Sequence, residues 1–454
     1  MNSGARLRPG EPPSGAQGDA PPDAGAALYR RVAVALIPFL FACYVVAMID
    51  RLNVGYAKLQ FMGELHFDEA AFGVAAGSLY VGYILFEIPS NLMLQRLGVR
   101  VTLLRIMVLW GTFTMAMAFA SSRWGFYSIR FLIGAAEAGF FPGMIYYSTL
   151  WFPNRYRARV ISAIAFAVPV SGVIAAPVSA WILSGLNGAG GLSGWQWLFL
   201  LEGAPAVLLG VAAYFYLPNR PGQARFLTPA QRQAIATDLE REAAGSGGPR
   251  GRAGSASFAQ ALRRPRTYAL ALVYFAFYAT QSILLLWVPT LLRNAGAGSL
   301  DQIAWRAAAV SLAGVLGMAA IGWSSDRSGE RRWHLLACGA AGCAAFLALP
   351  AVATSADGTT ACLMAAAAAM FAFLALFWTV PTAELGADAR AGGIALVSSI
   401  GASGSALSPM FMGSMKVLTG SLFGAIAALV AAFACGLAAL AWLLARREGQ
   451  PRAA

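Results

Sequence analysis

The sequence predicts an all-α membrane protein with twelve transmembrane helices in two six-helix, pseudo-symmetric halves. The chain is 58% hydrophobic and only 12% charged, whereas a soluble domain carries about 25% charged residues. Its apolar runs are long enough to cross a bilayer, which takes roughly 20 residues per helix. The runs are continuous and do not alternate at every second residue, which favours helices over the strands of a β-barrel.

Six apolar runs stand on each side of a polar centre. In the first half we expect spans at 31–58, 72–95, 101–120, 124–149, 160–184 and 197–217. In the second half we expect them at 267–293, 305–324, 333–351, 359–382, 391–414 and 421–445. The domain boundaries that follow are a disordered cytoplasmic tail at 1–28, a six-helix half at 29–217, a cytoplasmic linker at 218–266, a second half at 267–446 and a short tail at 447–454.

Two short features refine this plan. Residues 228–243, "TPAQRQAIATDLEREA", begin with Thr-Pro and predict a surface helix within the linker. Arg30 and Arg31 precede an apolar run in the manner of a signal peptide, but that run is too long and leads into further spans.

Positive charge is distributed unevenly among the loops. The net charge of +13 would suggest nucleic acid as a partner in a soluble protein, but cytoplasmic loops of membrane proteins also collect Lys and Arg. Arginines crowd the loops after spans two, four, six and eight, and the other loops hold few: Lys58, Arg123, Arg293 and Lys416. This alternation predicts a multi-pass protein of the cell inner membrane with both termini in the cytoplasm.

The cysteines and histidines give no sign of redox or metal chemistry. All five cysteines fall inside predicted spans, there is no CxxC pair, and the chain has two histidines. We therefore expect no disulfide, no metal site and no cofactor. The sequence contains no nucleophile–base set and no phosphate loop, so we do not expect an enzyme.

A loop motif recurs at equivalent positions of the two halves. After span eight the chain reads GxxxDRxGxR, and after span two Arg, Gly and Arg recur at the same spacing. Physically, the first glycine would permit close helix approach, the Asp would cap or pair, and the arginines would stay in the cytoplasm. A generic turn with positive-inside charge explains one copy, but two matched copies favour a repeat. The residues are Gly322, Asp326, Arg327, Gly329 and Arg331, with Arg96, Gly98 and Arg100.

Charged residues inside the predicted spans are expensive and mark function by default. Span one carries Asp50 and Arg51, and span four carries Arg130 and Glu137, seven residues apart and therefore on one helical face. We expect Gly134, between them, to leave that face open. Span two adds Glu87, with Tyr80 and Tyr83 at helical spacing.

Asp50, Arg51, Arg130 and Glu137 sum to zero charge, and two interpretations of the set are open. It is either a structural ion-pair network or a site in which arginines hold an anion while a carboxylate carries a proton. The planar fork of arginine suits a carboxylate ligand, which favours the second interpretation. Neighbouring residues of a helix point about 100° apart, so Arg51 can face an anion while Asp50 faces another partner.

Four segments carry a resemblance to a known family: "IDRLNVGYA", "GYILFEIPSNLMLQRLGVR", "RFLIGAAEAGFFPGMIYYSTLWFPNRYRAR" and "GWQWLFLLEGAPAVLLG". They resemble the anion:cation symporter family of the major facilitator superfamily, in its organic-acid branch of tartrate, phthalate, 4-hydroxyphenylacetate and sugar-acid permeases. The resemblance covers nearly the whole chain. It implies the major facilitator fold and proton-coupled uptake of an organic carboxylate anion by a monomer in the bilayer, with no nucleic acid involved.

The resemblance also implies roles for residues. Asp50 and Glu137 resemble the proton-coupling carboxylates, Arg51 the ligand of the substrate carboxylate, and Arg130 the residue that tunes Glu137. Tyr83 and Trp378 resemble aromatic residues of the substrate cavity. Tyr278 and Gln281, on span seven, are further candidates for substrate binding on our own interpretation, and packing explains them about equally well.

Two departures from the family pattern bear on the substrate. A tyrosine often stands two positions before the Asp, where this chain has Met48, and span eleven often reads NSIGN, where this chain has Ser398 and Ala402. Fewer long hydrogen-bonding side chains then face the substrate. This favours an acid with fewer hydroxyl groups than a sugar acid, either aromatic or short and aliphatic.

Two rival functions remain to be weighed. An efflux antiporter of drugs or metabolites would often carry a Gly-Pro pair on span five, where this chain has Ala176-Pro177. A non-transporting membrane sensor would carry a large soluble output domain, which the spans leave no room for. The sequence therefore favours transport over sensing, and uptake over efflux.

Overall fold

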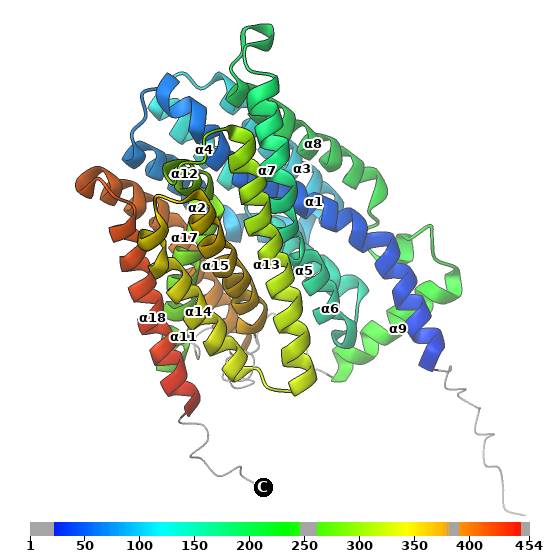
Figure 1. The fold of residues 1–454 in the computed structure, drawn as a ribbon. Helices are drawn as coiled ribbons and strands as arrows, with labels where there is room; N and C mark the ends of the chain where they lie inside the picture. Colours follow the sequence, from blue (N-terminus) through cyan, green and yellow to red (C-terminus); the bar gives the residue numbers. More distant parts are fainter. Residues whose placement is uncertain (1–21, 246–259, 261, 379, 381–389, 446–454) are drawn as a thin grey trace, which may run out of the picture.

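The computed structural model describes residues 22–245, 260, 262–378, 380 and 390–445, and these residues are helical throughout apart from short connections. The first half contains α1 (Pro22–Glu64), α2 (Glu69–Leu97), α3 (Val99–Ala116), α4 (Arg123–Glu137), α5 (Phe140–Trp151), α6 (Asn154–Ala165), α7 (Ala167–Gly185) and α8 (Gly194–Tyr216). The linker contributes α9 (Pro229–Gly245). The second half contains α11 (Pro265–Ser282), a π-helical turn η4 (Ile283–Trp287), α12 (Val288–Asn294), α13 (Leu300–Ser328), α14 (Arg332–Ala348), α15 (Ala356–Phe377), α17 (Arg390–Thr419) and α18 (Phe423–Ala445). Figure 1 shows them as one bundle.

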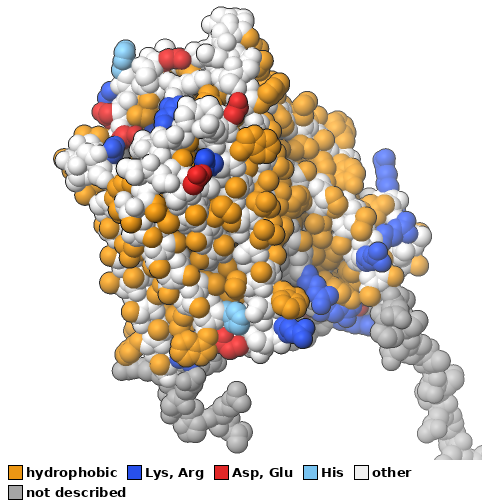
Figure 2. Space-filling view, viewed as in Figure 1, with side chains coloured by type: hydrophobic (Ala, Val, Ile, Leu, Met, Phe, Trp, Pro, Cys, Tyr) orange, Lys and Arg blue, Asp and Glu red, His pale blue; other side chains and the backbone are white. Residues whose placement is uncertain are grey.

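The helices confirm a multi-pass membrane protein with the predicted fold class. Among the described residues, ten helical stretches are long and apolar enough to cross a membrane. The other two predicted spans correspond to α4 with α5 and to α17. Hydrophobic side chains cover the flank of the molecule, and charged side chains gather toward its two ends (Figure 2). An apolar flank between two charged ends is the surface expected of a protein in a bilayer.

Two predicted element boundaries change in the structure. The expected span 124–149 is broken between α4 and α5, where Gly139 adopts a left-handed conformation with φ 84°. Helix α1 begins at Pro22, so residues 22–28 of the expected disordered tail belong to a helix. Residues 1–21 and 447–454 lie outside the described residues.

Glycines let the two halves approach closely along α2 and α17. A Cβ added to Gly73 would meet the Pro409 carbonyl oxygen at 2.4 Å, and one on Gly77 would meet the Ala406 oxygen at 2.7 Å. A Cβ on Gly413 would meet the carbonyl oxygen of Glu69 at 2.1 Å. Small residues of this kind allow membrane helices to pack backbone against backbone. The contacts fall in the first nine residues of α2, so the two halves pack backbone against backbone at that end.

A buried ion pair lies at the same end of the bundle. Lys58 of α1 places its Nζ atom 2.5 Å from Glu69 Oε2 at the start of α2. The same ammonium lies over two aromatic rings, 4.3 Å from the centroid of Phe72 and 4.0 Å from that of Trp287. Trp287 belongs to the second half, so this cation–π contact crosses the interface between the halves.

The predicted linker helix is confirmed as α9, and it is docked against the first half. Arg155 pairs with Asp238 at 3.0 Å, and Arg157 pairs with Glu242 at 3.4 Å. Tyr29 of α1 donates a hydrogen bond to Asp238 at 3.0 Å. In Figure 1, α9 lies beside α6 and the beginning of α1. The helix of the linker is therefore held against the first half by ion pairs and a hydrogen bond.

Candidate functional site

Arg51 of α1 and Glu137 of α4 form an ion pair in the interior of the first half. The Arg51 Nε atom donates to Glu137 Oε1 at 2.8 Å, and its Nη2 atom lies 2.7 Å from the same oxygen. Glu137 is buried, with 1% of its side chain exposed, whereas 19% of Arg51 remains exposed. The second oxygen of Glu137 has no hydrogen-bond partner among the described residues. The pair thus leaves one oxygen of the buried carboxylate without a hydrogen bond in the described part of the chain.

Asp50 makes a separate set of contacts. Its Oδ1 atom accepts from Asn53 Nδ2 at 3.0 Å, and its Oδ2 atom accepts from the indole nitrogen of Trp110 at 2.8 Å. Asp50, with 1% exposure, is held by neutral donors of α1 and α3. The adjacent residues Asp50 and Arg51 thus address different partners, as their angular separation on a helix predicts.

Arg130 is buried at 2% exposure without a carboxylate partner in the described part of the chain. Its Nε atom has no hydrogen-bond partner there, and no ion pair joins it to Asp50 or Glu137. Both carboxylates are near enough to interact with it electrostatically. A buried guanidinium that lacks a direct counter-charge is costly, and a bound anion would remove that cost.

The prediction that Gly134 leaves one face of α4 open is wrong. A Cβ on Gly134 would sit 1.8 Å from the Leu79 carbonyl oxygen of α2, and one on Gly82 would sit 2.2 Å from the Phe131 oxygen of α4. The glycine therefore serves to bring the two backbones together. This contact places the tyrosines of α2 beside the charges of α4.

Aromatic hydroxyl groups surround the charged set in the first half. The guanidinium carbon of Arg51 lies 5.3 Å from the ring centroid of Tyr83. Tyr80 and Tyr44 are both buried and interact electrostatically with Arg51 and Glu137. The sequence analysis gave Tyr44 no role, although it lies on α1 seven residues before Arg51, two turns along the same face.

The second half supplies a connected aromatic group opposite these charges. The Trp378 indole nitrogen donates to the Tyr274 hydroxyl at 3.1 Å, and the Tyr274 hydroxyl donates to that of Tyr278 at 3.2 Å. Tyr278 interacts electrostatically with Arg51, so the two halves meet here. The structure thus brings the predicted residues Tyr278 and Trp378 together through Tyr274. Sequence reasoning missed Tyr274, although its position four residues before Tyr278 indicates a shared helical face.

Two further candidates occupy different surroundings. Gln281 of α11 is buried at 6% exposure, and its side-chain oxygen has no hydrogen-bond partner among the described residues. Ser398 of α17 is exposed. Among the described residues, no hydrogen bond or ion pair joins either of them to Asp50, Arg51, Arg130 or Glu137.

The loop motifs have a local structural role at the helix ends. Gly98 joins α2 to α3 with φ 80°, and Gly329 ends α13 with φ 67°, so both positions require glycine's conformational freedom. Arg100 donates from its Nε atom to the Tyr214 carbonyl at 2.6 Å, and Arg96 is exposed.

In the second motif, Asp326 pairs with Arg331 at 3.3 Å, and Arg327 lies 5.5 Å from the Trp323 ring centroid. The expectation of close helix approach at Gly322 is wrong in this conformation, because a Cβ there would meet nothing within 4 Å.

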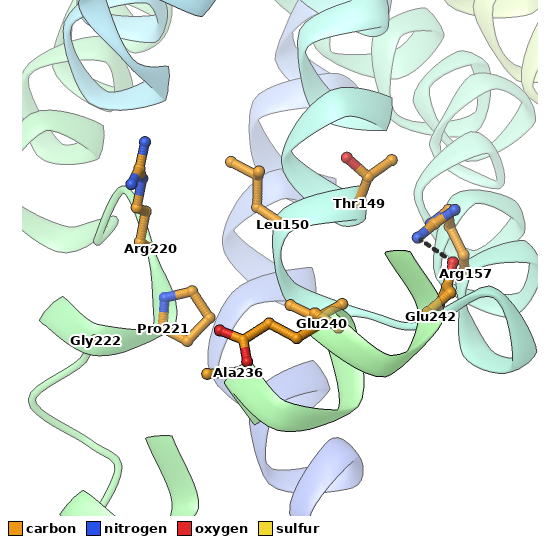
Figure 3. A pocket seen from close by; sticks show the side chains of 10 residues that line it. Thr149, Leu150, Arg157, Arg220, Pro221, Gly222, Ala236, Glu240 and Glu242 are labelled. Atoms are coloured by element: carbon orange, nitrogen blue, oxygen red, sulfur yellow. Dashed lines mark hydrogen bonds and ion pairs between the residues drawn. The ribbon is translucent and has the colours of Figure 1, made fainter. Parts of the chain in front are cut away.

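A surface pocket of about 440 Å³ lies away from the charged set. Figure 3 shows it between the end of α5, the segment around Arg220 and Pro221, and α9, with Arg157 paired to Glu242 on one side. Its walls are linker residues, the end of α5 and Arg157 of α6, so it lies where the linker packs against the first half. Among the described residues no cluster of three or more His, Cys, Asp or Glu could hold a metal ion.

Comparisons with known proteins agree on one family. The family model described as Major Facilitator Superfamily matches residues 40–409. A putative metabolite transport protein, NicT, of Pseudomonas putida is 39% identical over 400 residues, 88% of this chain and 90% of the relative. A putative tartrate transporter of Agrobacterium vitis is 38% identical over 89% of this chain and 88% of its own. A quinolone resistance transporter of Acinetobacter baumannii is 38% identical over 87% of this chain and 89% of its own.

Solved structures share the fold. A bacterial homologue of the human lysosomal transporter Spinster, in an inward-facing and unoccupied conformation, superposes with a TM-score of 0.69 at 19% identity. The match covers 90% of this chain and 96% of that one. At this identity the likeness speaks for the fold alone.

Proposed function

Because the chain belongs to the Major Facilitator Superfamily, whose members are transporters, we propose that it is a secondary active transporter that takes up an organic carboxylate together with protons. The observation that carries this proposal is that only one of two neighbouring arginines forms an ion pair with Glu137. Arg51 is held by Glu137, while Arg130 is buried nearby without a direct counter-charge in the described chain. A carboxylate substrate would fit between them once Glu137 is neutral.

The proposed cycle uses alternating access. Protons enter Asp50 and Glu137 from outside, and the neutral Glu137 releases Arg51. Arg51 and Arg130 then bind the substrate carboxylate through charge-assisted hydrogen bonds. The loaded carrier rocks to the inward state, and the anion and protons leave to the cytoplasm. Return of Glu137 to Arg51 compensates the arginine charge in the empty carrier.

The aromatic group of the second half supports a choice of substrate class. Tyr274, Tyr278 and Trp378 give a wall of rings and hydroxyl groups opposite the arginines. The positions of span eleven that often carry Asn hold Ser398 and Ala402 here. We propose an aromatic or short aliphatic acid, with few hydroxyl groups, as the substrate. The proposed setting is the inner membrane, as a monomer with both termini and the linker in the cytoplasm.

The test uses purified protein in proteoliposomes with a pH-sensitive dye trapped inside. Tartrate, galactonate, glucarate, phthalate, 4-hydroxyphenylacetate and nicotinate are added one at a time. Internal acidification with one acid, absent from empty liposomes and from liposomes with Arg130→Gln, supports proton–anion symport and names the substrate class. No acidification by folded, inserted protein with any of the six overturns proton-coupled uptake of this class.

A second candidate function is efflux, which the likeness to the quinolone resistance transporter favours. An antiporter would expel its substrate as protons enter. Proteoliposomes preloaded with a quinolone and given an inward proton gradient would then lose the drug, whereas a symporter of acids would retain it. The same preparation therefore separates the two functions.

A further inference from the structure

A second cavity, of about 220 Å³, lies where the end of α2, the start of α3 and the first residues of the linker meet. It adjoins the pocket of Figure 3, with which it shares Leu150 and Arg220. A single water needs only roughly 15 Å³ of such space, so the cavity has room for a small polar ligand. The proposed transport cycle does not use this cavity.

Two arginines line this cavity without a carboxylate partner. Arg96 lies in the last turn of α2 and Arg220 in the linker, and neither side chain makes an ion pair or a hydrogen bond within the described residues. In Figure 3 the Arg220 guanidinium points away from Glu240 of α9. The described residues that line the cavity include no Asp or Glu, so two positive charges face it uncompensated.

Two amide side chains add donors to the same cavity. The Asn219 Oδ1 atom accepts from the backbone nitrogen of Arg100 at 3.0 Å, and the Gln223 Oε1 atom accepts from the backbone nitrogen of Asn219 at 3.2 Å. A backbone N–H group only donates, so each amide turns its oxygen toward that group and its NH₂ group elsewhere. Neither NH₂ group donates a hydrogen bond within the described residues. The free ends of both amides are therefore donors.

Contacts from two sides hold these donors in place before any ligand arrives. Tyr147 of α5 donates from its hydroxyl to the Pro218 carbonyl at 2.8 Å, directly before Asn219. A Cβ on Gly98 would lie 3.2 Å from Asn219 Oδ1, so the glycine of the first loop motif leaves room for this side chain. Donors that are already positioned bind an anion with little further ordering cost.

We propose that this cavity is a binding site for a phosphoryl group, held by Arg96, Arg220, Asn219 and Gln223. The guanidinium groups would form charge-assisted, bidentate hydrogen bonds with the phosphate oxygens. A phosphate presents its oxygens tetrahedrally and accepts from donors on several sides, whereas a carboxylate accepts within one plane. The donors come from separate segments, the end of α2 and the linker, which favours the phosphate. The inference does not depend on the proposed transport activity.

Two sources can supply the phosphoryl group, a lipid headgroup or a phosphate in solution. Phe215 and Tyr216, which end α8 shortly before Asn219, are 76% and 54% exposed, as aromatic side chains at a membrane surface are. A headgroup of the adjacent leaflet can therefore reach the cavity. A soluble phosphate can reach it because Arg96 and Arg220 are exposed. In either case the bound group would tie the linker to the end of α2.

Hydrogen–deuterium exchange of the purified full-length protein in maltoside tests the site with both sources. Inorganic phosphate is compared with chloride at equal ionic strength, and phosphatidylglycerol with a diacylglycerol of the same chains, which lacks the phosphoryl group. Backbone amides at 98–101 and 219–223 should exchange about tenfold more slowly at a probe concentration about ten times the half-saturating one. Protection by phosphatidylglycerol alone identifies a lipid site, and protection by inorganic phosphate identifies a site for a soluble ligand.

Variants of the arginines test whether the protection arises in this cavity. Arg96→Gln and Arg220→Gln should each lose most of it, and because both arginines are exposed the fold should persist. Arg225→Gln is the matched control, since it removes the same charge from an exposed linker residue that does not line the cavity. Equal protection in all three variants would show unspecific charge screening and overturn the site. Absence of protection in wild type with both probes would overturn it as well.

Discussion

Glu137 is bound by Arg51 of α1, 2.7 Å away, and not by Arg130 of its own helix. Arg130 and Glu137 share a face of α4, two turns apart, which is too far for a direct ion pair. The pairing across helices leaves one arginine neutralised and the other buried without a direct partner in the described chain. In the proposed cycle, this asymmetry leaves Arg130 available to a substrate carboxylate.

Glu137→Gln should separate exchange from proton coupling. Glutamine mimics the neutral glutamate, so Arg51 stays available to the substrate while no proton is carried at this position. We expect substrate exchange across the membrane to persist within a few-fold of wild type and acid-driven accumulation to be lost. The measurement compares counterflow with uptake under an inward proton gradient in proteoliposomes. Robust acid-driven accumulation by this variant would remove Glu137 from the coupling role.

Arg51→Ala should abolish substrate binding and also lower stability. Removal of one partner leaves Glu137, which is 1% exposed, as an unpaired buried charge. Breaking a buried pair in this way costs roughly 3–5 kcal/mol. Thermal unfolding in detergent should show the loss, and the double variant Arg51→Ala with Glu137→Gln should recover much of it. Equal stability of Arg51→Ala and wild type would argue against the buried pair.

Gly134→Ala should disrupt the contact between α2 and α4. The new methyl group would lie 1.8 Å from the Leu79 carbonyl oxygen, so the backbones have to separate. Overpacking of this kind costs about 1–3 kcal/mol, and the shift would also move Tyr83 away from Arg51. Gly322→Ala is the matched control, because nothing lies within 4 Å of the added methyl group. A Gly134→Ala protein as stable as the control would show that this helix pair tolerates separation.

Lys58→Met should weaken the packing of the two halves against each other. The ammonium of Lys58 pairs with Glu69 and lies 4.0 Å from the Trp287 ring centroid across the interface. A desolvated cation–π contact is worth about 2 kcal/mol. We expect faster hydrogen–deuterium exchange in residues 69–77 and 406–413, where the glycines of α2 and α17 meet. Lys416→Met is the control, because it removes a half-buried lysine of α17 whose Nζ atom donates to the Gly420 carbonyl oxygen. Identical exchange in both variants would show that Lys58 does not hold the halves together.

The sequence by itself determined the fold class. Hydropathy, span length and charge are local properties that survive whatever the helices pack against, so the twelve helices and the linker helix α9 follow from them. The sequence also singled out Asp50, Arg51, Arg130 and Glu137, because a charge inside an apolar run stands out without any knowledge of its neighbours.

Only the tertiary structure decided how those residues are paired. Sequence spacing places Arg130 and Glu137 on one face, but the rotation and approach of α1 decide that Arg51 takes the carboxylate. The contact of Gly134 with Leu79 and the hydrogen bonds from Trp378 through Tyr274 to Tyr278 likewise join segments far apart in the chain. Such contacts depend on distances of a few ångströms between packed helices, which no local pattern of residues encodes.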